Sequence, residues 1–333
     1  MGPMALDTAF WKNRRVFVTG ATGMIGSWLV KRLLDLDSFI VALVLDANPQ
    51  SELFRSGDVQ RVTVVNGRLE DLGVLQRAIA ENEIETVFHL GAQTQVGVGY
   101  HAPWITLESN VRGSYNLMEA CRLQRERIEQ IIVASSDKAY GDSEVLPYTE
   151  EMPLKGRHPY DASKSCTDII AQAYAHTYEL PVAIARCGNV YGGADLNWSR
   201  IVPGTIRSLL CEEQPVLRSD GKFVRDYIYQ KDVVNAYLVL AERFKDLQLQ
   251  EHAFNFSTES WVKVEEMVSL IQKIMKKTHL NPIVLDQARA EIRDQSLSSQ
   301  KARAMLGWKH EYSLESGLCE TIAWYESFLG ERS

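Results

Sequence analysis

Asp137 and Lys138 are the residues whose types and spacing most clearly suggest proton transfer. They follow Ser135 and Ser136 at the end of an apolar run from Ile131 to Ala134. A carboxyl and an amine in one pocket can act as an acid and a base. For this, Asp137 must hold a proton and Lys138 must be neutral when the proton moves. Burial favours both neutral forms, whereas the attraction between the charged forms opposes them. A solvated surface ion pair is the alternative interpretation.

Three glycines near the N-terminus form a second pattern. Gly20, Gly23 and Gly26 lie between a short apolar run, Val16 to Thr19, and residues with helical spacing. Glycines permit a tight turn and the close approach of a phosphate, which then lies on the free N–H groups of a helix N-terminus. Asp46 ends the next apolar run, 20 residues after Gly26, and suits the ribose 2′-hydroxyl of NAD while repelling the 2′-phosphate of NADP. The alternatives are a simple turn and a solvated loop acid. Together the two features predict NAD as the cofactor.

Tyr160 and Lys164 are four residues apart, which places them on one face of a predicted helix that runs to about Tyr178. A phenol is a poor base at neutral pH, but a neighbouring ammonium and a positively charged nicotinamide both lower its pKa. The phenolate can then take a proton from a sugar hydroxyl while a hydride passes to NAD⁺. The same spacing occurs on surface helices. The glycine loop and the strand end at Ser136 favour an active-site pair.

Apolar strands alternate with helical stretches along the first half of the chain. This order predicts an α/β, doubly wound parallel sheet covered on both faces. After Cys187 the alternation stops, which indicates a smaller, interleaved C-terminal lobe. We expect a dinucleotide-binding domain over 10–186, with about 226–256 added, and a substrate lobe over 187–225 and 257–330. The expected strands are 16–19, 39–45, 62–65, 86–90, 131–134 and 181–185, and the expected helices include 27–34, 72–81, 104–123, 160–178 and 231–244.

The glycine spacing, G-x-x-G-x-x-G, and six further stretches resemble the extended short-chain dehydrogenase/reductase family. The stretches are HLGAQ (89–93), NVRGSYNLMEAC (110–121), YDASK (160–164), RCGNVYG (186–192), RDYIYQKDVVNAY (225–237) and KARAMLGW (301–308). They are spread over nearly the whole chain. The resemblance implies a Rossmann sheet, NAD, and an active-site serine, tyrosine and lysine, which here are Ser136, Tyr160 and Lys164.

The resemblance also implies which residues contact the cofactor. One departure is Arg68, at a position near the adenine where the family usually has an aspartate. The implied cofactor residues are Gly20, Thr22, Gly23, Met24, Ile25, Gly26, Asp46, Leu69, Leu90, Ala92, Gln93, Tyr160 and Lys164.

Asp137 and Lys138 give a finer resemblance, to nucleotide-sugar 4,6-dehydratases and most of all to CDP-glucose 4,6-dehydratases. These enzymes oxidise C4 of a hexose, eliminate water across C5 and C6, and return the hydride to C6. By this resemblance Asp137 is the acid for the C6 hydroxyl and Lys138 is the base at C5. The stretch GNVYGGADLNWSRIVPG (188–204) is similar to the CDP-glucose enzymes, whereas RDYIYQKDV (225–233) is commoner among epimerases and other dehydratases.

The resemblance assigns the nucleotide sugar to Asn189, Arg200, Arg225 and Arg293. Bidentate guanidinium contacts suit a diphosphate, and a surface ion pair is the alternative for each arginine. The base and the hexose stay open. Two other functions compete: a nucleotide-sugar 4-epimerase or decarboxylase, and a non-catalytic NAD-binding regulator. The family usually dimerises through a four-helix bundle, so we expect a homodimer.

Composition excludes several classes of protein. The 333 residues carry a net charge of −7 with no run of Lys and Arg, which argues against a nucleic-acid surface. No segment approaches the ~20 apolar residues of a membrane span, and the N-terminus has no apolar secretory core, so we expect a cytoplasmic protein. The five cysteines are widely spaced, without C-x-x-C or H-E-x-x-H patterns, which predicts no metal site and free, mostly buried thiols.

Overall fold

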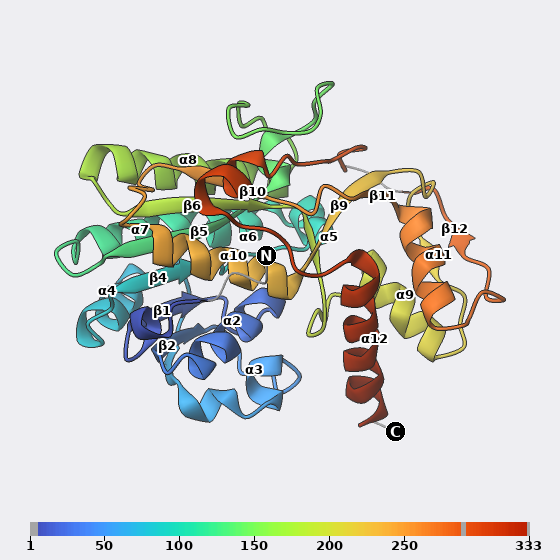
Figure 1. Cartoon of the computed structure of the whole chain (residues 1–333), viewed down its shortest axis with the longest axis horizontal. Coiled ribbons are helices and arrows are strands. Elements are labelled where there is room, and N and C mark those ends of the chain that lie inside the picture. Colours follow the sequence, from blue (N-terminus) through green and yellow to red (C-terminus); the bar gives the residue numbers. More distant parts are fainter. Residues whose placement is uncertain (1–5, 288–290, 332–333) are drawn as a thin grey trace.

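The computed structural model describes residues 6–287 and 291–331. A large parallel sheet with helices on both faces forms one region, and a smaller lobe adjoins the edge where its strands end (Figure 1). Residues 288–290, which fall within the expected lobe 257–330, lie outside the described residues.

The central sheet has seven strands in the order β10-β6-β5-β4-β1-β2-β3, and all its neighbouring pairs are parallel. The strands are β1 (Arg15–Thr19), β2 (Phe39–Val44), β3 (Thr63–Asn66), β4 (Thr86–His89), β5 (Gln130–Ser136), β6 (Val182–Cys187) and β10 (Ala253–Phe256). The predicted doubly wound architecture is therefore confirmed. The strand order reverses between β1 and β4, which is where such sheets bind ligands.

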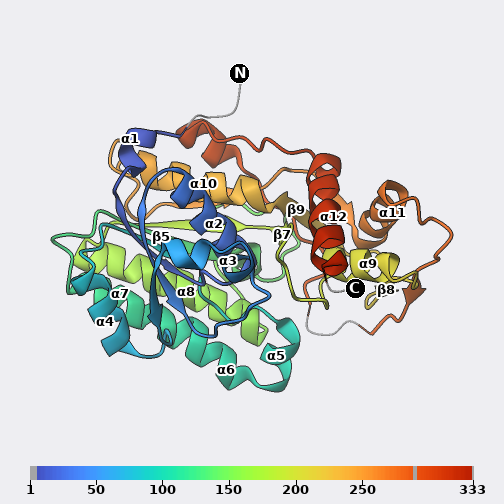
Figure 2. The same ribbon diagram turned by 90° about the horizontal axis from the view of Figure 1, so that it is seen from below.

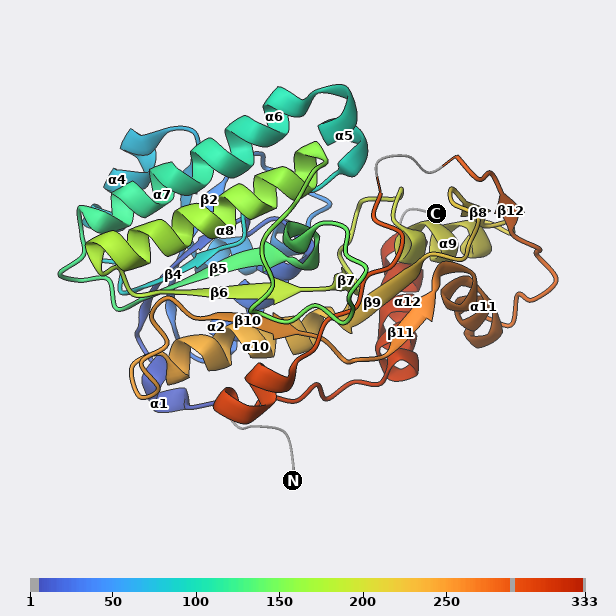
Figure 3. The ribbon, with the colours of Figure 1, turned by 90° about the horizontal axis from the view of Figure 1, so that it is seen from above.

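Helices cover both faces of this sheet, and the pleat divides the core between them. Val16 and Val18 pack with α2 and α10 on one face, whereas Phe17 packs with α4, α7 and α8 on the other. Figure 3 shows α7 and α8 on the opposite side of the sheet from α10. The helices of this region are α1 (Thr8–Trp11), α2 (Met24–Asp35), α3 (Glu52–Arg55), α4 (Leu72–Glu81), α8 (Pro159–Tyr178) and α10 (Gln230–Arg243), with the 3₁₀ turns η1 (Asp58–Arg61) and η3 (Asp137–Tyr140).

The single helix expected over 104–123 is interrupted. Instead the chain forms α5 (Val96–His101), α6 (Pro103–Leu107), the π-helical turn η2 (Glu108–Arg112) and α7 (Gly113–Arg122). The side-chain hydroxyls of Ser114 and Thr167 both donate to the carbonyl of Asn110 within this turn. The Asn110 side chain in turn bonds Gln93 and Ser163. These side-chain contacts account for the wider turn, because the two hydroxyls occupy the Asn110 carbonyl, which in a regular α-helix accepts a hydrogen bond from a backbone amide.

The smaller lobe is built around a three-stranded sheet of order β11-β9-β7. Its helices α9, α11 and α12 lie close together (Figure 2), and Ile206, Met267 and Tyr325 pack in the core that they share. The elements are β7 (Asn189–Tyr191), α9 (Ile201–Leu210), β8 (Val216–Leu217), β9 (Val224–Tyr229), β11 (Trp261–Lys263), α11 (Val264–Ile274), β12 (Ile283–Val284), the π turn η4 (Ala302–Leu306) and α12 (Leu314–Gly330). Between β9 and β11, α10 and β10 return to the main sheet. The domain boundaries stay a prediction.

All five cysteines are free. Cys121 and Cys187 are buried and Cys166 is half-buried, but Cys211 and Cys319 are exposed, so the thiols are less buried than expected. Within residues 6–287 and 291–331, no helix has the length and apolar character needed to cross a bilayer.

Candidate active site

A cavity of about 1300 Å³ lies between the ends of the main-sheet strands and the smaller lobe. The loop after β1 and the ends of β4, β5 and β6 form one wall, and β8, β9, α9 and the loop before α9 form the other. The sequence-predicted residues that line this cavity are Gly20, Thr22, Gly23, Met24, Ile25, Gly26, Leu69, Leu90, Ala92, Ser136, Lys138, Tyr160, Lys164, Asn189, Arg200 and Arg225.

The glycine loop turns tightly between β1 and α2. Gly20 has φ +72°, and a Cβ there would lie 2.7 Å from the backbone nitrogen of Gly91. A Cβ on Gly26 would lie 2.0 Å from the carbonyl oxygen of Gly20. Gly23 is the N-cap of α2 and has no side chain to occupy the first amides of the helix. This cradle leaves backbone N–H groups facing a cavity, so the residues fit a dinucleotide pyrophosphate.

The loop after β4 is fixed against the glycine loop. The hydroxyl of Thr19 accepts hydrogen bonds from the backbone amides of Leu90, at 3.1 Å, and Gly91, at 3.0 Å, and contacts His89 Nδ1 at 3.0 Å. Burial, with a smaller contribution from Lys164, lowers the pKa of His89 to about 3, so this histidine is neutral. The two loops are therefore held together by neutral groups.

Two predicted cofactor residues lie outside the cavity lining. Asp46 is exposed, two residues beyond the end of β2, although its neighbour Leu45 lines the cavity. Gln93 is engaged elsewhere: its Oε1 accepts from Thr106 at 2.8 Å and its Nε2 donates to the carbonyl of Gln95 at 3.1 Å. Cofactor contacts by Asp46 and Gln93 stay predictions. Arg68, the departure from the family, does line the cavity.

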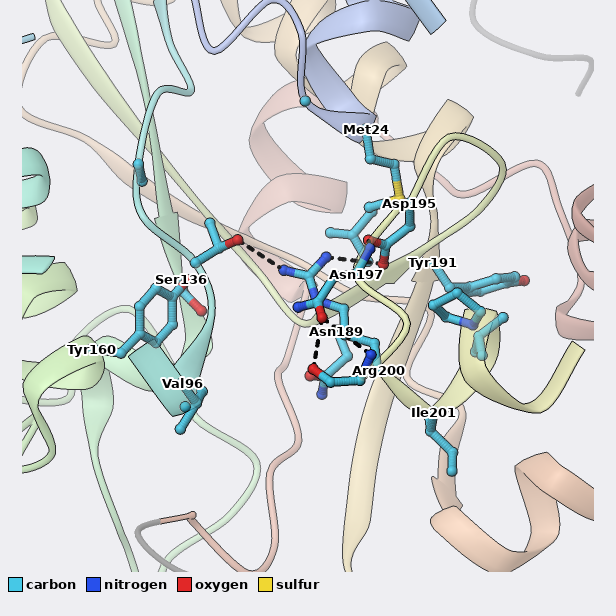
Figure 4. A pocket seen from close by; sticks show the side chains of 18 of the residues that line it. Met24, Val96, Ser136, Tyr160, Asn189, Tyr191, Asp195, Asn197, Arg200 and Ile201 are labelled. Carbon is cyan, nitrogen blue, oxygen red and sulfur yellow. Dashed lines mark hydrogen bonds and ion pairs between the residues drawn. The ribbon is translucent and has the colours of Figure 1, made fainter. Parts of the chain in front are cut away.

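Ser136, Tyr160 and Lys164 come together where β5 ends against α8. Lys164 donates to the carbonyl of Ala134 at 2.8 Å, which anchors its ammonium beside the strand end. Ser136 and Tyr160 lie side by side at the cavity (Figure 4). The i, i+4 spacing read from the sequence thus places the tyrosine and the lysine on one helix face.

The pKa of Tyr160 in the chain without cofactor is raised to about 12. Burial is the largest cause, and Asp137 and Asp161 also raise the pKa, whereas Arg200 and Ser136 lower it. Removal from water therefore outweighs the chain's own cations, and the lowering expected from the ammonium together with a bound nicotinamide stays a prediction. The cation with the largest effect is Arg200. Burial also lowers the pKa of Lys164, to about 8, against the opposing effect of Asp168.

Lys138 lies between two partners at the cavity wall. Its Nζ donates to Asn189 Oδ1 at 3.2 Å and to Asp137 Oδ1 at 3.4 Å. Asp137 is fully buried, also accepts from the Ser136 hydroxyl at 3.0 Å, and does not line the cavity. The surface-pair interpretation is wrong for these two residues, because the side chain of Lys138 is only 20% exposed and that of Asp137 is fully enclosed.

Arg200 crosses the cavity from the small lobe. It is the N-cap of α9, and its guanidinium contacts Asp195 at 3.0 Å and, on the opposite wall, Thr94 at 3.2 Å (Figure 4). Arg225 is buried and donates to the carbonyls of Val224 and Arg293 and to Glu291 at 3.3 Å.

Arg293 differs from the other predicted arginines. Its side chain is exposed and outside the cavity lining, and only its carbonyl serves the site, by holding Arg225. Substrate binding by the Arg293 side chain stays a prediction.

Asp161 is a cavity residue that the sequence reading did not select. It follows Tyr160 in the first turn of α8 and is 5% exposed. The only signal in the sequence was an acid inside YDASK, whose position toward the cavity depends on how α8 packs against η3. Among the described residues, no group of three or more His, Cys, Asp or Glu side chains could hold a metal ion.

Comparisons with known proteins agree with this geometry. A sequence model of the NAD dependent epimerase/dehydratase family matches residues 16–255. The CDP-glucose 4,6-dehydratase of Salmonella typhimurium is 29% identical over 97% of this chain and 94% of its own length.

Solved structures are similar over almost the whole chain. The dTDP-glucose 4,6-dehydratase of Bacillus anthracis, solved with NAD, is 25% identical with a TM-score of 0.83, over 94% of this chain and 97% of its own. The UDP-glucose 4-epimerase of Thermotoga maritima, solved with UDP-glucose, is 27% identical with a TM-score of 0.84, over 95% of this chain and 99% of its own.

Proposed function

The chain belongs to the NAD dependent epimerase/dehydratase family, and from that premise we propose that it dehydrates a nucleotide-linked hexose. CDP-glucose is the favoured substrate, because a relative that matches along nearly the whole chain is a CDP-glucose 4,6-dehydratase. The product is a nucleotide-linked 4-keto-6-deoxyhexose, so the enzyme is a lyase that uses NAD. The cytoplasmic location stays a prediction.

Lys138 carries this proposal. Oxidation and reduction at C4 need only a hydroxyl, a phenol and an ammonium, which Ser136, Tyr160 and Lys164 supply. A further amine beside Ser136, held toward the cavity by Asn189, has no task in such a reaction. It has one in a dehydration, where a base must remove the proton at C5.

The first step is at C4 of the sugar. Tyr160 takes the proton of the C4 hydroxyl, and Ser136 hydrogen-bonds the same oxygen. When bound, NAD supplies the hydride acceptor for C4 and the hydride donor for C6. Lys164 lies beside Tyr160 and binds the nicotinamide ribose by the family resemblance. Arg200, which reaches across from the small lobe, is the cation that most favours the phenolate.

The second step uses the acidity that the C4 ketone gives to the C5 proton. Lys138 removes that proton and the C6–O bond breaks. The resemblance gives the acid role to Asp137, which is hydrogen-bonded to both Ser136 and Lys138. Arg225, Arg200 and Asn189 would bind the nucleotide diphosphate and the sugar.

A product assay tests this function against the 4-epimerase alternative. Incubation with CDP-glucose should give a 4-keto-6-deoxy sugar, whereas an epimerase would give only an exchange of hexoses. Other nucleotide hexoses in the same panel can be ranked by the rise in Tm that each causes. NAD binding without turnover of any hexose would favour the non-catalytic regulator.

Lys138→Met tests the step that separates the two enzyme classes. We expect elimination to fall by ~10²–10⁴-fold, the usual contribution of a general base. The substrate should still reduce bound NAD⁺, which the absorbance of NADH reports. Loss of both steps together would mean that Lys138 has a structural role.

We also propose that the protein is a homodimer through α6, α7 and α8. Large apolar side chains are exposed on these neighbouring helices: Trp104 (67%), Leu107 (42%), Ile169 (53%) and Tyr178 (42%). Exposed apolar surface of this kind favours a protein partner, and a second copy is the partner that the family resemblance implies. Figure 3 shows α6, α7 and α8 side by side at one surface.

Light scattering checks the oligomeric state. The wild-type protein should be a dimer, and Ile169→Lys should give monomers, because it places a charge in the apolar contact. Val145→Lys is the matched control, since Val145 is 68% exposed on the loop before α8. A monodisperse wild-type monomer would contradict the proposal.

A further inference from the structure

A buried arginine lies behind the active site, near the end of β6. Arg186 is 3% exposed and lies outside the cavity lining. Its Nε and Nη2 donate to the two carboxylate oxygens of Asp168 on α8, at 2.8 and 2.9 Å. Its Nη1 donates to the hydroxyl of Tyr140 on η3, at 2.9 Å. The planar guanidinium therefore bonds to two different elements at the same time.

These two elements carry the two halves of the proposed chemistry. α8 carries Tyr160 and Lys164, which serve the oxidation at C4, and Asp168 lies one helical turn after Lys164. η3 begins with Asp137 and Lys138, which serve the elimination, and ends at Tyr140. A shift of Asp168 or Tyr140 would therefore move the pair on the same element.

The surroundings of Tyr140 hold η3 firmly. The Tyr140 side chain is buried, and its hydroxyl donates to Asn255 Oδ1 at 2.7 Å while it accepts from Arg186. Ser165, on α8, donates to the carbonyl of Ala139 at 2.8 Å and so holds the middle of η3. A buried polar network of this kind fixes the positions of its members.

We propose that Arg186 is a positioning residue that sets the spacing between the oxidising pair on α8 and the eliminating pair on η3, through Asp168 and Tyr140. This inference rests on the dehydration proposed above. Asp168 and Tyr140, like Arg186, lie outside the cavity lining, so their effect on the reaction must pass through the residues that they hold. One hexose must meet Tyr160 at C4 and Lys138 at C5, and a misplacement of about 1 Å can cost ~10²-fold in rate.

The test separates the two steps in a single turnover of the NAD-loaded protein with CDP-glucose. The absorbance of bound NADH rises as C4 is oxidised and falls as the hydride returns to C6 after elimination. Deuterium at C5 slows the fall where elimination limits it.

The variants change one arm of the network at a time. Tyr140→Phe removes only a hydroxyl from the η3 arm, and Asp168→Glu keeps the charge of the α8 arm but moves the carboxylate by one methylene. Ser38→Ala is the control, because it removes a buried hydroxyl that donates to the carbonyl of Trp11 at 2.9 Å, just before β2 and far from the strand ends that line the cavity.

We expect Tyr140→Phe to form NADH at the wild-type rate but to show a fall that is ~10-fold slower and more sensitive to deuterium at C5. The loss is limited because Ser165 still holds η3. Asp168→Glu should slow the rise by ~10-fold. Arg186→Lys should slow both phases, since an ammonium cannot replace the fork of the guanidinium. Ser38→Ala should stay within about twofold of the wild type in both phases.

Tyr140→Phe decides the outcome even if Arg186→Lys does not fold, because it keeps the ring in place. If it slows both phases equally, or neither, the network is merely structural and the inference is overturned. A wild-type protein that forms NADH but no 4-keto-6-deoxy product would instead overturn the proposed function, and the inference with it.

Discussion

The two walls of the cavity are built in different ways. The wall formed by the loop after β1 and the ends of β4, β5 and β6, here called the cofactor wall, is shaped by glycine backbone that the buried Thr19 hydroxyl and a neutral His89 support from behind. The substrate wall carries charged side chains that are already paired within the chain, as in Arg200 with Asp195 and Arg225 with Glu291. The first wall is thus a shape that is complete before a ligand arrives. On the second wall, the phosphates of a substrate must replace the carboxylates that now pair with the arginines.

The largest effect should come from a change in the shape of the cofactor wall. In Gly26→Ala the new Cβ meets the Gly20 carbonyl at 2.0 Å, where backbone cannot move aside cheaply. Overpacking of this kind costs ~1–3 kcal/mol, so we expect the Kd for NAD to rise by up to ~100-fold. Titration calorimetry checks this. Gly97→Ala is the control, because Gly97 lines the cavity with nothing within 4 Å of its Cβ position.

A change of charge on the substrate wall should act on the sugar and not on the cofactor. Arg200→Gln removes a charged hydrogen-bond donor worth ~1.5–3 kcal/mol, so KM for CDP-glucose should rise by ~10–100-fold with an unchanged NAD content. The kcat should also fall, because Arg200 favours the Tyr160 phenolate. Arg293→Gln should stay within about twofold of the wild type, as a surface substitution does. An equal rise in KM for both variants would reinstate Arg293 as a binding residue.

The two walls should also differ in their response to pH. As pH rises through about 8, Lys164 loses its proton, so the cofactor wall loses the ammonium that binds the nicotinamide ribose by the family resemblance, and the Kd for NAD should rise. KM for CDP-glucose should stay flat over the same range, because the arginines of the substrate wall keep their charge. A pH profile of the Kd for NAD beside a profile of KM measures both. A Kd for NAD that stays flat across pH 8 would contradict the contribution of Lys164.

The buried carboxyl of Asp161 should reduce the stability of the fold at neutral pH. Folding raises the pKa of Asp161 from its ordinary value of 3.8 to about 6, so the folded state binds more protons and stability falls as pH rises from about 4 to 6. Asp161→Asn removes this effect. Its free energy of unfolding should therefore exceed that of the wild type at pH 8, by up to ~3 kcal/mol. Urea titration at pH 4 and pH 8 checks the sign, since the gain should vanish at the lower pH.

The smallest expected effect comes from a partner of a substrate-wall arginine. Glu291→Gln releases Arg225 from a partly exposed ion pair, which is worth at most ~1 kcal/mol. KM for CDP-glucose should fall by up to ~5-fold, because the diphosphate no longer competes with a carboxylate for the guanidinium. A rise in KM would mean that Glu291 orients Arg225 instead of competing for it.

The features that sequence could predict are those set by short-range rules. Continuous apolar strands and the spacing of Gly20, Gly23 and Gly26 allow few other structures, and the spacing of Tyr160 and Lys164 fixes a shared helix face. The wider turn at Asn110 was not predictable in this way, because it depends on bonds to Gln93 and Ser163 across the fold.

Electrostatic surroundings were the least predictable part of the site. The direction of the Tyr160 pKa depends on how much water the cavity excludes, which spacing does not reveal. The exposure of Asp46 and Arg293 depends on loop paths, and the placement of Asp161 depends on the contact between α8 and η3. In each case the sequence gives the type of the residue, whereas its burial and its charged neighbours depend on the tertiary structure.

The return of the chain to the main sheet between β9 and β11 has a practical consequence. Since the small lobe is assembled from separate stretches of polypeptide, no single cut divides the protein into two autonomous pieces. A protease that nicks one connecting loop should leave both fragments associated under native conditions. The lobe is thus tethered to the sheet by several chain crossings, which restrict how far the two halves can separate when a ligand enters or leaves.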